Sequence, residues 1–215
     1  MRISISGNAL QVHPLRNGLL LIAVLMYCGL MVSSAQVQPQ YVPSVDRLEL
    51  AVTYSGAYAG LSSGDHQFWL NGGSAELAGQ FYRGLSLVAN VTGLHTENTG
   101  AGVPLNLVTA TFGPRYTVTL AHHSARTHTV SFFGEGLAGE ANGFDGLFPG
   151  PSSATSSSHS LAIQVGGGAD VGLSRHLSVR IVQASWLRTQ LPNATTNVQN
   201  DLLLGAGIVF HTISK

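Results

Sequence analysis

The feature that most constrains this chain is an alternation of side chains over ten residues near its C-terminus, from Asp201 to Phe210. Every second residue is apolar: Leu202, Leu204, Ala206, Ile208 and Phe210. The residues between them are small or partly polar: Asp201, Leu203, Gly205, Gly207 and Val209. Because successive side chains of a β-strand point to opposite faces, the segment predicts a strand with one apolar face. Apolar residues outward and small or polar residues inward are typical of a strand in a closed membrane barrel.

Seven further segments show the same alternation, at about 46–58, 67–81, 85–94, 105–118, 128–141, 161–171 and 177–189. Together with the C-terminal segment they predict an all-β fold, an eight-stranded antiparallel up-and-down transmembrane β-barrel. Two segments contain irregularities. Pro114 cannot donate a ladder hydrogen bond, so we expect a bulge or a strand end near it. Glu135 and Glu140 fall on opposite faces of one segment, which predicts a bulge or an early strand end there.

The N-terminal 35 residues have the pattern of a secretory signal peptide. Arg2 and Arg16 supply positive charge, an apolar run covers 19–32, and small residues at 33–35 form a cleavage site. The apolar run is short for a membrane-spanning helix, which needs about 20 residues. We therefore predict a signal peptide at 1–35, an extended segment at 36–45 and the barrel at 46–215. The one cysteine, Cys28, lies in the leader, so the mature chain has no thiol chemistry.

Composition agrees with a membrane barrel. Charged residues make up 9% of the chain, against roughly 25% in soluble domains. The mature sequence lacks any run near the ~20 apolar residues of a spanning helix, which leaves strands as the membrane-crossing elements. Loss of Arg2 and Arg16 with the leader leaves eight basic and ten acidic residues. This balance gives no electrostatic reason to expect a nucleic-acid partner.

The connections predict which end of the barrel faces outward. Longer loops follow the first, third, fifth and seventh strands and tighter turns follow the others, as in bacterial outer-membrane barrels. We expect the loops 95–104, 142–159 and 190–200 to be extracellular, with 142–159 the longest and most mobile, and both chain ends to be periplasmic. Aromatic residues predict two interfacial belts. The periplasmic belt contains Phe81, Tyr82, Phe112, Tyr116, Phe132 and Phe210, and the extracellular belt contains Tyr58, Trp69 and Trp186.

Four charged residues are candidates for the lumen: Glu76, Arg115, Asp170 and Arg180. Side chains fill the interior of an eight-stranded barrel, so buried charges there should pair with one another. We interpret them as a structural network and not as a transport or catalytic site. Arg180 faces the lumen only if Val179 and Ile181 face lipid.

The mature chain has eight histidines: His66, His95, His122, His123, His128, His159, His176 and His211. Their spacing does not predict a metal site with a third ligand. A hydrolase would need a serine within hydrogen-bond reach of its base. The run His122-His123-Ser124 and the pair His159-Ser160, with Glu140 or Asp145 as the acid, have the required residue types.

Taken together, these patterns resemble the small OmpA/OmpX-like outer-membrane β-barrel proteins over roughly 48–210. The resemblance depends on T-F-G-P-R-Y at 111–116, G-G-G-A-D-V-G-L-S-R-H-L-S-V-R at 166–180 and Q-N-D-L-L-L-G-A-G-I-V-F at 199–210. It implies a monomer in the outer membrane of a Gram-negative bacterium, surrounded by lipid. It also implies recognition by the barrel insertion machinery through the C-terminal strand ending at Phe210.

We therefore expect a small outer-membrane barrel with a structural or surface-interaction role. We predict no catalytic, cofactor-binding or metal-binding residues and no enzymatic activity. Two alternatives stay open. One is an outer-membrane barrel enzyme that hydrolyses lipid esters, with His159 as the best candidate residue. The other is a soluble lipocalin-like periplasmic barrel, in which the alternating apolar residues would lie inside.

Overall fold

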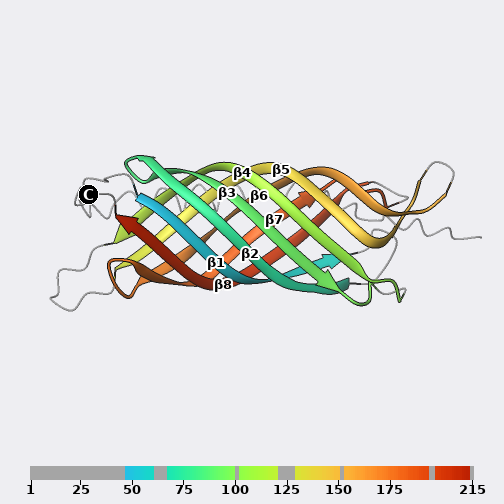
Figure 1. The fold of residues 1–215 in the computed structure, drawn as a ribbon, viewed down its shortest axis with the longest axis horizontal. Coiled ribbons are helices and arrows are strands. Elements are labelled where there is room, and N and C mark those ends of the chain that lie inside the picture. The colour runs from blue at the N-terminus through green and yellow to red at the C-terminus, as the bar shows by residue number, and fades with distance from the viewer. Residues whose placement is uncertain are drawn as a thin grey trace, which may run out of the picture. The chain divides into compact units, whose positions relative to one another are not determined.

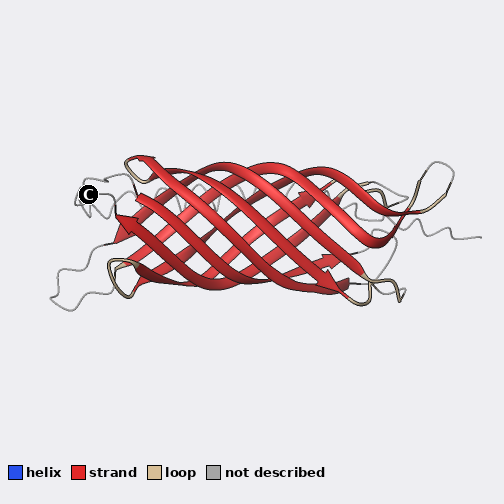
Figure 2. Ribbon diagram, in the orientation of Figure 1, coloured by secondary structure: helices blue, strands red, loops and turns tan. Residues whose placement is uncertain are grey.

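A computed structural model describes residues 47–60, 67–99, 102–120, 129–150, 153–193 and 197–213. These residues form eight strands and the connections between them (Figure 2). The strands are β1 (Arg47–Gly60), β2 (Gln67–Tyr82), β3 (Leu85–Thr96), β4 (Leu105–Leu120), β5 (Val130–Phe148), β6 (Thr155–Gly172), β7 (Leu177–Thr189) and β8 (Gln199–Ile213). The predicted leader at 1–35 and extended segment at 36–45 lie outside the described residues.

Each strand pairs antiparallel with its neighbours in the sequence, and β1 pairs with β8 to close the barrel (Figure 1). The closing register places Val52 opposite Ile208. It extends past Phe210, because His211 and Thr212 pair with residues at the start of β1. The predicted eight-stranded antiparallel barrel is therefore confirmed, with a C-terminal strand that is longer than predicted. No helix within the described ranges is long and apolar enough to cross a membrane.

The alternation of side chains follows the prediction closely. Outward positions carry large exposed apolar residues, as on β8, where Leu202, Leu204, Ile208 and Phe210 are exposed. Inward positions are buried and mostly small or polar, as on β1, where Thr53 and Ser55 are buried. A lipocalin-like barrel would need the apolar set inside. The soluble alternative is therefore wrong, because the apolar residues form the outer surface.

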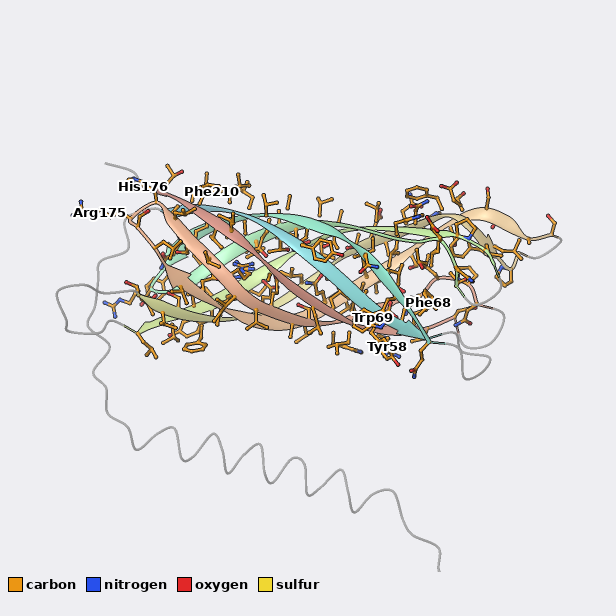
Figure 3. The ribbon with its side chains drawn as sticks, turned by 90° about the horizontal axis from the view of Figure 1, so that it is seen from below. Tyr58, Phe68, Trp69, Arg175, His176 and Phe210 are labelled. Atoms are coloured by element: carbon orange, nitrogen blue, oxygen red, sulfur yellow. The ribbon has the colours of Figure 1, made fainter. Side chains whose placement is uncertain are left out.

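We call the two ends of the barrel the loop end and the turn end. The loop end has the connections 61–66, 97–104, 149–154 and 190–198, and the turn end has 83–84, 121–129, 173–176 and both chain termini of the barrel. In Figure 3 the aromatic residues Tyr58, Phe68 and Trp69 lie at the loop end, and Phe210 lies near the turn end. Most of the predicted belt residues are exposed. Phe112, however, lies midway along β4 and not at its end.

The expected alternation of long loops and tight turns is only partly correct. The connection 121–129 at the turn end is longer than 61–66 or 149–154 at the loop end. The predicted long loop 142–159 is wrong, since β5 and β6 continue through it. Asn142 pairs with His159 and Phe144 with Ser157, which leaves a short connection at 149–154. A serine-rich composition suggested a loop, but backbone pairing within a long hairpin does not depend on apolar side chains.

Two other predicted irregularities are not found. β4 continues through Pro114, and its register with both neighbouring strands is the same before and after this residue. β5 also continues without a register shift from Val130 to Phe144. Glu135 and Glu140 do occupy opposite faces, but Glu140 is simply exposed on the outside while Glu135 is buried in the lumen.

The register shift that matters for the lumen lies in β7. Pairing with β8 is interrupted between Arg180 and Gln183, and Ile181 and Val182 are both exposed on the outer surface. A bulge inserts one extra residue and changes which face the following side chains occupy. Here it lets Arg180 and Gln183 both point into the lumen.

Candidate functional site

The lumen is layered along the barrel axis, and β7 passes through every layer. From the turn end to the loop end its inward residues are Ser178, Arg180, Gln183, Ser185 and Leu187, followed by Thr189 at the end of the strand, and all are buried. The layers are therefore polar, then charged, then polar, then apolar. The space among the side chains of the middle polar layer amounts to about 10 Å³, room for about one water molecule.

Arg115 on β4 is the first centre of the charged layer. Its Nη1 donates to Oε1 of Glu76 at 2.5 Å, and its Nε donates to Oε2 of Glu135 at 3.0 Å. Its Nη2 also donates to Oε2 of Glu135. Arg115 is 2% exposed, so its guanidinium depends on these carboxylates in place of water.

Arg180 on β7 is the second centre. It binds Asp170 with two parallel hydrogen bonds, Nε to Oδ1 at 2.9 Å and Nη2 to Oδ2 at 3.2 Å. Its Nη1 donates to Glu76 at 3.1 Å and to Gln183 at 3.2 Å. Gln183 in turn donates to Oε1 of Glu135 at 3.1 Å, which closes a ring of hydrogen bonds across the lumen.

Phe133 on β5 fills the space beside this ring. The guanidinium carbons of Arg115 and Arg180 lie 4.2 and 4.3 Å from the centre of its aromatic ring. Cations at this distance from an aromatic face are attracted by its electron density, most strongly where water is excluded. We use the name charge plug for Glu76, Arg115, Phe133, Glu135, Asp170, Arg180 and Gln183.

The four lumen charges expected from the sequence, at 76, 115, 170 and 180, all belong to the charge plug. The expectation that they pair is confirmed, as is the outward position of Ile181. Glu135, Gln183 and Phe133 were not predicted as members. Glu135 occupies an inward position in the alternation of side chains along β5, so this pattern could have identified it. Gln183 could not be identified in this way, because the bulge in β7 shifts its parity, and Phe133 resembles any aromatic residue of a core.

A second cluster lies in the lumen near the turn end. Oγ of Ser178 and Nε2 of His211 are 2.8 Å apart, and Nδ1 of His211 is 3.3 Å from Oε1 of Glu49. The three residues come from β7, β8 and β1, which are neighbours around the barrel. A serine, a histidine and a carboxylate linked in this order form the arrangement that activates a serine nucleophile. The sequence search did not single out this set, although all three residues have inward parity near the turn end.

The residues of the alternative hydrolase hypothesis, His159 and Ser160 with Glu140 or Asp145, are placed differently. His159 and Ser160 are consecutive on β6, so their side chains point to opposite faces of the sheet. Oγ of Ser160 accepts a hydrogen bond from the backbone N–H of Gln190 at 3.2 Å. Asp145 accepts a hydrogen bond from Asn106 at 2.7 Å. The proposed pair of His159 with Ser160 therefore has no suitable geometry.

The remaining candidates do not form a metal site within the described part of the chain. There, no group of three His, Cys, Asp or Glu side chains could hold an ion. Nδ1 of His95 donates a hydrogen bond to Oδ1 of Asn106 at 2.8 Å, and His176 lies in the β6–β7 turn at the turn end (Figure 3). His66, His128 and the run at 122–124 lie outside the described residues.

Comparison with known proteins gives a match by structure alone. No protein-family model matches the chain, and no curated protein matches it in sequence. The solved structure of Neisserial surface protein A (NspA) matches with a TM-score of 0.51 and 13% identity, over 76% of this chain and 96% of that one. At this identity the likeness shows the fold alone.

Two further structures match with lower scores. Ail, the attachment invasion locus protein of Yersinia pestis, has a TM-score of 0.46 and 11% identity, over 79% of this chain and 100% of that one. The outer membrane protein OprG from Pseudomonas aeruginosa has a TM-score of 0.46 and 8% identity, over 79% and 97%. The match to NspA shows the fold of a small outer-membrane β-barrel, and the expected resemblance to OmpA/OmpX-like barrels is confirmed as a resemblance of fold.

Proposed function

We propose that this chain is a monomeric outer-membrane barrel that serves as a rigid, non-conducting support for its surface loops. The observation that carries the proposal is the charge plug, whose residues bond to one another across the lumen from five strands. The exposed apolar residues of the outer face support a location in lipid. The loop end would face outward, and the insertion machinery would recognise the strand that contains Phe210.

Conductance across planar lipid bilayers tests this function. Full-length mature protein should give no current steps, because the charge plug leaves no continuous aqueous path. The double variant Phe133→Ala with Arg115→Ala should give small steps, since it removes the aromatic ring and one guanidinium from the lumen.

The matched control is Phe132→Ala. Phe132 is the neighbouring residue of β5 but points outward and is 49% exposed. This variant should give no current steps, like the unmodified protein. Regular current steps from the unmodified protein would contradict a support function and indicate a pore.

The cluster of Ser178, His211 and Glu49 favours one other function, hydrolysis of an ester at the turn end. In that reaction Oγ of Ser178 attacks the ester carbonyl while Nε2 of His211 takes its proton. The proton then passes to the departing alkoxide, and water releases the acyl group from the serine by the same steps. Glu49 would hold His211 in orientation through Nδ1.

A fluorophosphonate probe tests this second function, because it labels serines that are activated as nucleophiles. The mature protein in lipid nanodiscs should be labelled at Ser178, and Ser178→Ala and His211→Ala should abolish the labelling. Ser160→Ala serves as the control and should leave it unchanged. Absence of labelling in the unmodified protein would exclude the hydrolase and leave Ser178 as a structural hydrogen-bond partner of His211.

A further inference from the structure

The loop end of the lumen contains a cavity of about 250 Å³, separate from the charge plug. Apolar side chains form most of its wall, including Phe68, Leu105, Phe148 and Leu191. The cavity is continuous with a buried apolar cluster that contains Leu70, Leu107, Leu187 and Leu203. Figure 3 shows Phe68 at this end of the barrel, beside Trp69. An apolar cavity of this size suits a ligand with one aromatic ring and a short side chain.

One ionisable group, Asp201 on β8, lies among the described residues that line the cavity. The residue is 4% exposed, and its Oδ1 has no hydrogen-bond partner among the described residues. The carboxylates at 135 and 170 in the charge plug, by contrast, bind a guanidinium with one or both oxygens. A buried carboxylate oxygen without a donor is unfavourable, so a ligand that donates a hydrogen bond to Oδ1 would stabilise this site.

We propose that this cavity binds a small organic cation, with its apolar body against the cavity wall and its ammonium group at Oδ1 of Asp201. The described lining residues supply no cation of their own to neutralise the carboxylate. A charged N–H donor makes a stronger hydrogen bond to a carboxylate than a neutral hydroxyl does. An anion of the same size would be repelled. The cavity thus combines an apolar wall with a preference for a positively charged ligand group. This proposal does not depend on whether the lumen conducts ions.

Calorimetric titration of the mature protein in lipid nanodiscs tests the proposal, with 2-phenylethylammonium as the probe. Its neutral and anionic counterparts are 2-phenylethanol and 3-phenylpropionate, and empty nanodiscs correct for partition into lipid. Three variants separate the contributions. Asp201→Asn keeps the shape but removes the charge, Ala59→Phe fills the cavity, and Leu202→Ala changes the adjacent outward residue.

We expect saturable binding of 2-phenylethylammonium, at least about tenfold weaker binding of 2-phenylethanol, and no binding of 3-phenylpropionate. Asp201→Asn should weaken binding of the cation by a similar factor, Ala59→Phe should abolish it, and Leu202→Ala should leave it unchanged. The gel mobility of the unheated protein verifies that each variant is folded. If Ala59→Phe does not fold, Ala59→Leu takes its place. No saturable binding by the unmodified protein, or equal binding by Asp201→Asn, would overturn the proposal.

Discussion

Arg115 is surrounded by partners that replace the water its guanidinium lost on folding. It is 2% exposed and is bound by Glu76 and Glu135, with the ring of Phe133 beside it. Removing one member of a buried ion pair leaves the other charge without compensation, and that cost exceeds the loss of the contact itself. The free energy of unfolding of the barrel should therefore depend strongly on this one side chain.

Replacing Arg115 with methionine should lower the free energy of unfolding by about 3–5 kcal/mol, because the buried Glu135 loses its guanidinium partner and Glu76 keeps only Arg180. Urea unfolding of the protein in detergent micelles measures the change. Arg175→Met in the β6–β7 turn is the control and should change stability by less than about 0.5 kcal/mol, since this residue is exposed. Equal effects of the two substitutions would show that the charge plug contributes nothing specific to stability.

The alternation of inward and outward positions along a strand predicts which charged residues lie in the lumen, but it does not predict their partners. Glu76 and Arg115 could be recognised because each is a charge at an inward position of a regular alternation. Their pairing across the lumen depends on how far neighbouring strands are staggered, which alternation alone does not determine. The cavity beside Asp201 was not predictable either, because its shape depends on which side chains of other strands line it.

Among the strands, β6 shows how a glycine makes room for the charge plug. Gly168 is paired with Phe133 and faces the lumen beside its ring. A Cβ at this position would lie 2.7 Å from Cζ of Phe133 and 2.4 Å from the carbonyl oxygen of Val182. Both distances are too short, so the ring can occupy its place only because residue 168 has no side chain.

Substitution of Gly168 by alanine should destabilise the barrel by about 1–3 kcal/mol, because it overpacks the lumen at Phe133. The midpoint of urea unfolding reports the change. Gly79→Ala on β2 is the matched control, since a Cβ there meets no atom within 4 Å. An unfolding midpoint for Gly168→Ala equal to that of Gly79→Ala would show that both the ring of Phe133 and the backbone at Val182 can move aside freely.

Strand positions could be predicted more reliably than strand lengths. β7 has the predicted bounds, 177–189, because a turn and a loop of polar residues mark both of its ends. The hairpin of β5 and β6 is longer than predicted, because its outer part is held by backbone pairing between residues such as Asn142 and His159. Polar strand ends beyond the apolar belt carry no alternation of apolar and polar residues, so composition alone suggests a loop there.

The molecule as a whole presents an apolar belt on the outside of a closed sheet. Val52 lies within this belt, near the middle of β1, and is 52% exposed. The cost of a charge on the lipid-facing side of a membrane barrel depends on depth, and for arginine at the midplane it is about 2–4 kcal/mol. An exposed residue outside the belt carries no such cost.

The variant Val52→Arg should therefore lose about 2–4 kcal/mol of folding stability in phospholipid bilayers. Ser157→Arg, on the exposed outer part of β6, should stay close to the unmodified protein. Unfolding by guanidinium chloride in lipid vesicles compares the two variants. Similar stabilities would indicate that the belt does not contact lipid hydrocarbon.

The most direct measurement is the gel mobility in SDS of protein from the outer-membrane fraction, compared before and after boiling. A closed barrel with all its strands paired resists SDS at room temperature and migrates differently once boiling has unfolded it. We predict such a shift, with the protein recovered from the outer membrane. Identical mobility before and after boiling, with the protein in the soluble fraction, would contradict both the closed barrel and its place in the membrane.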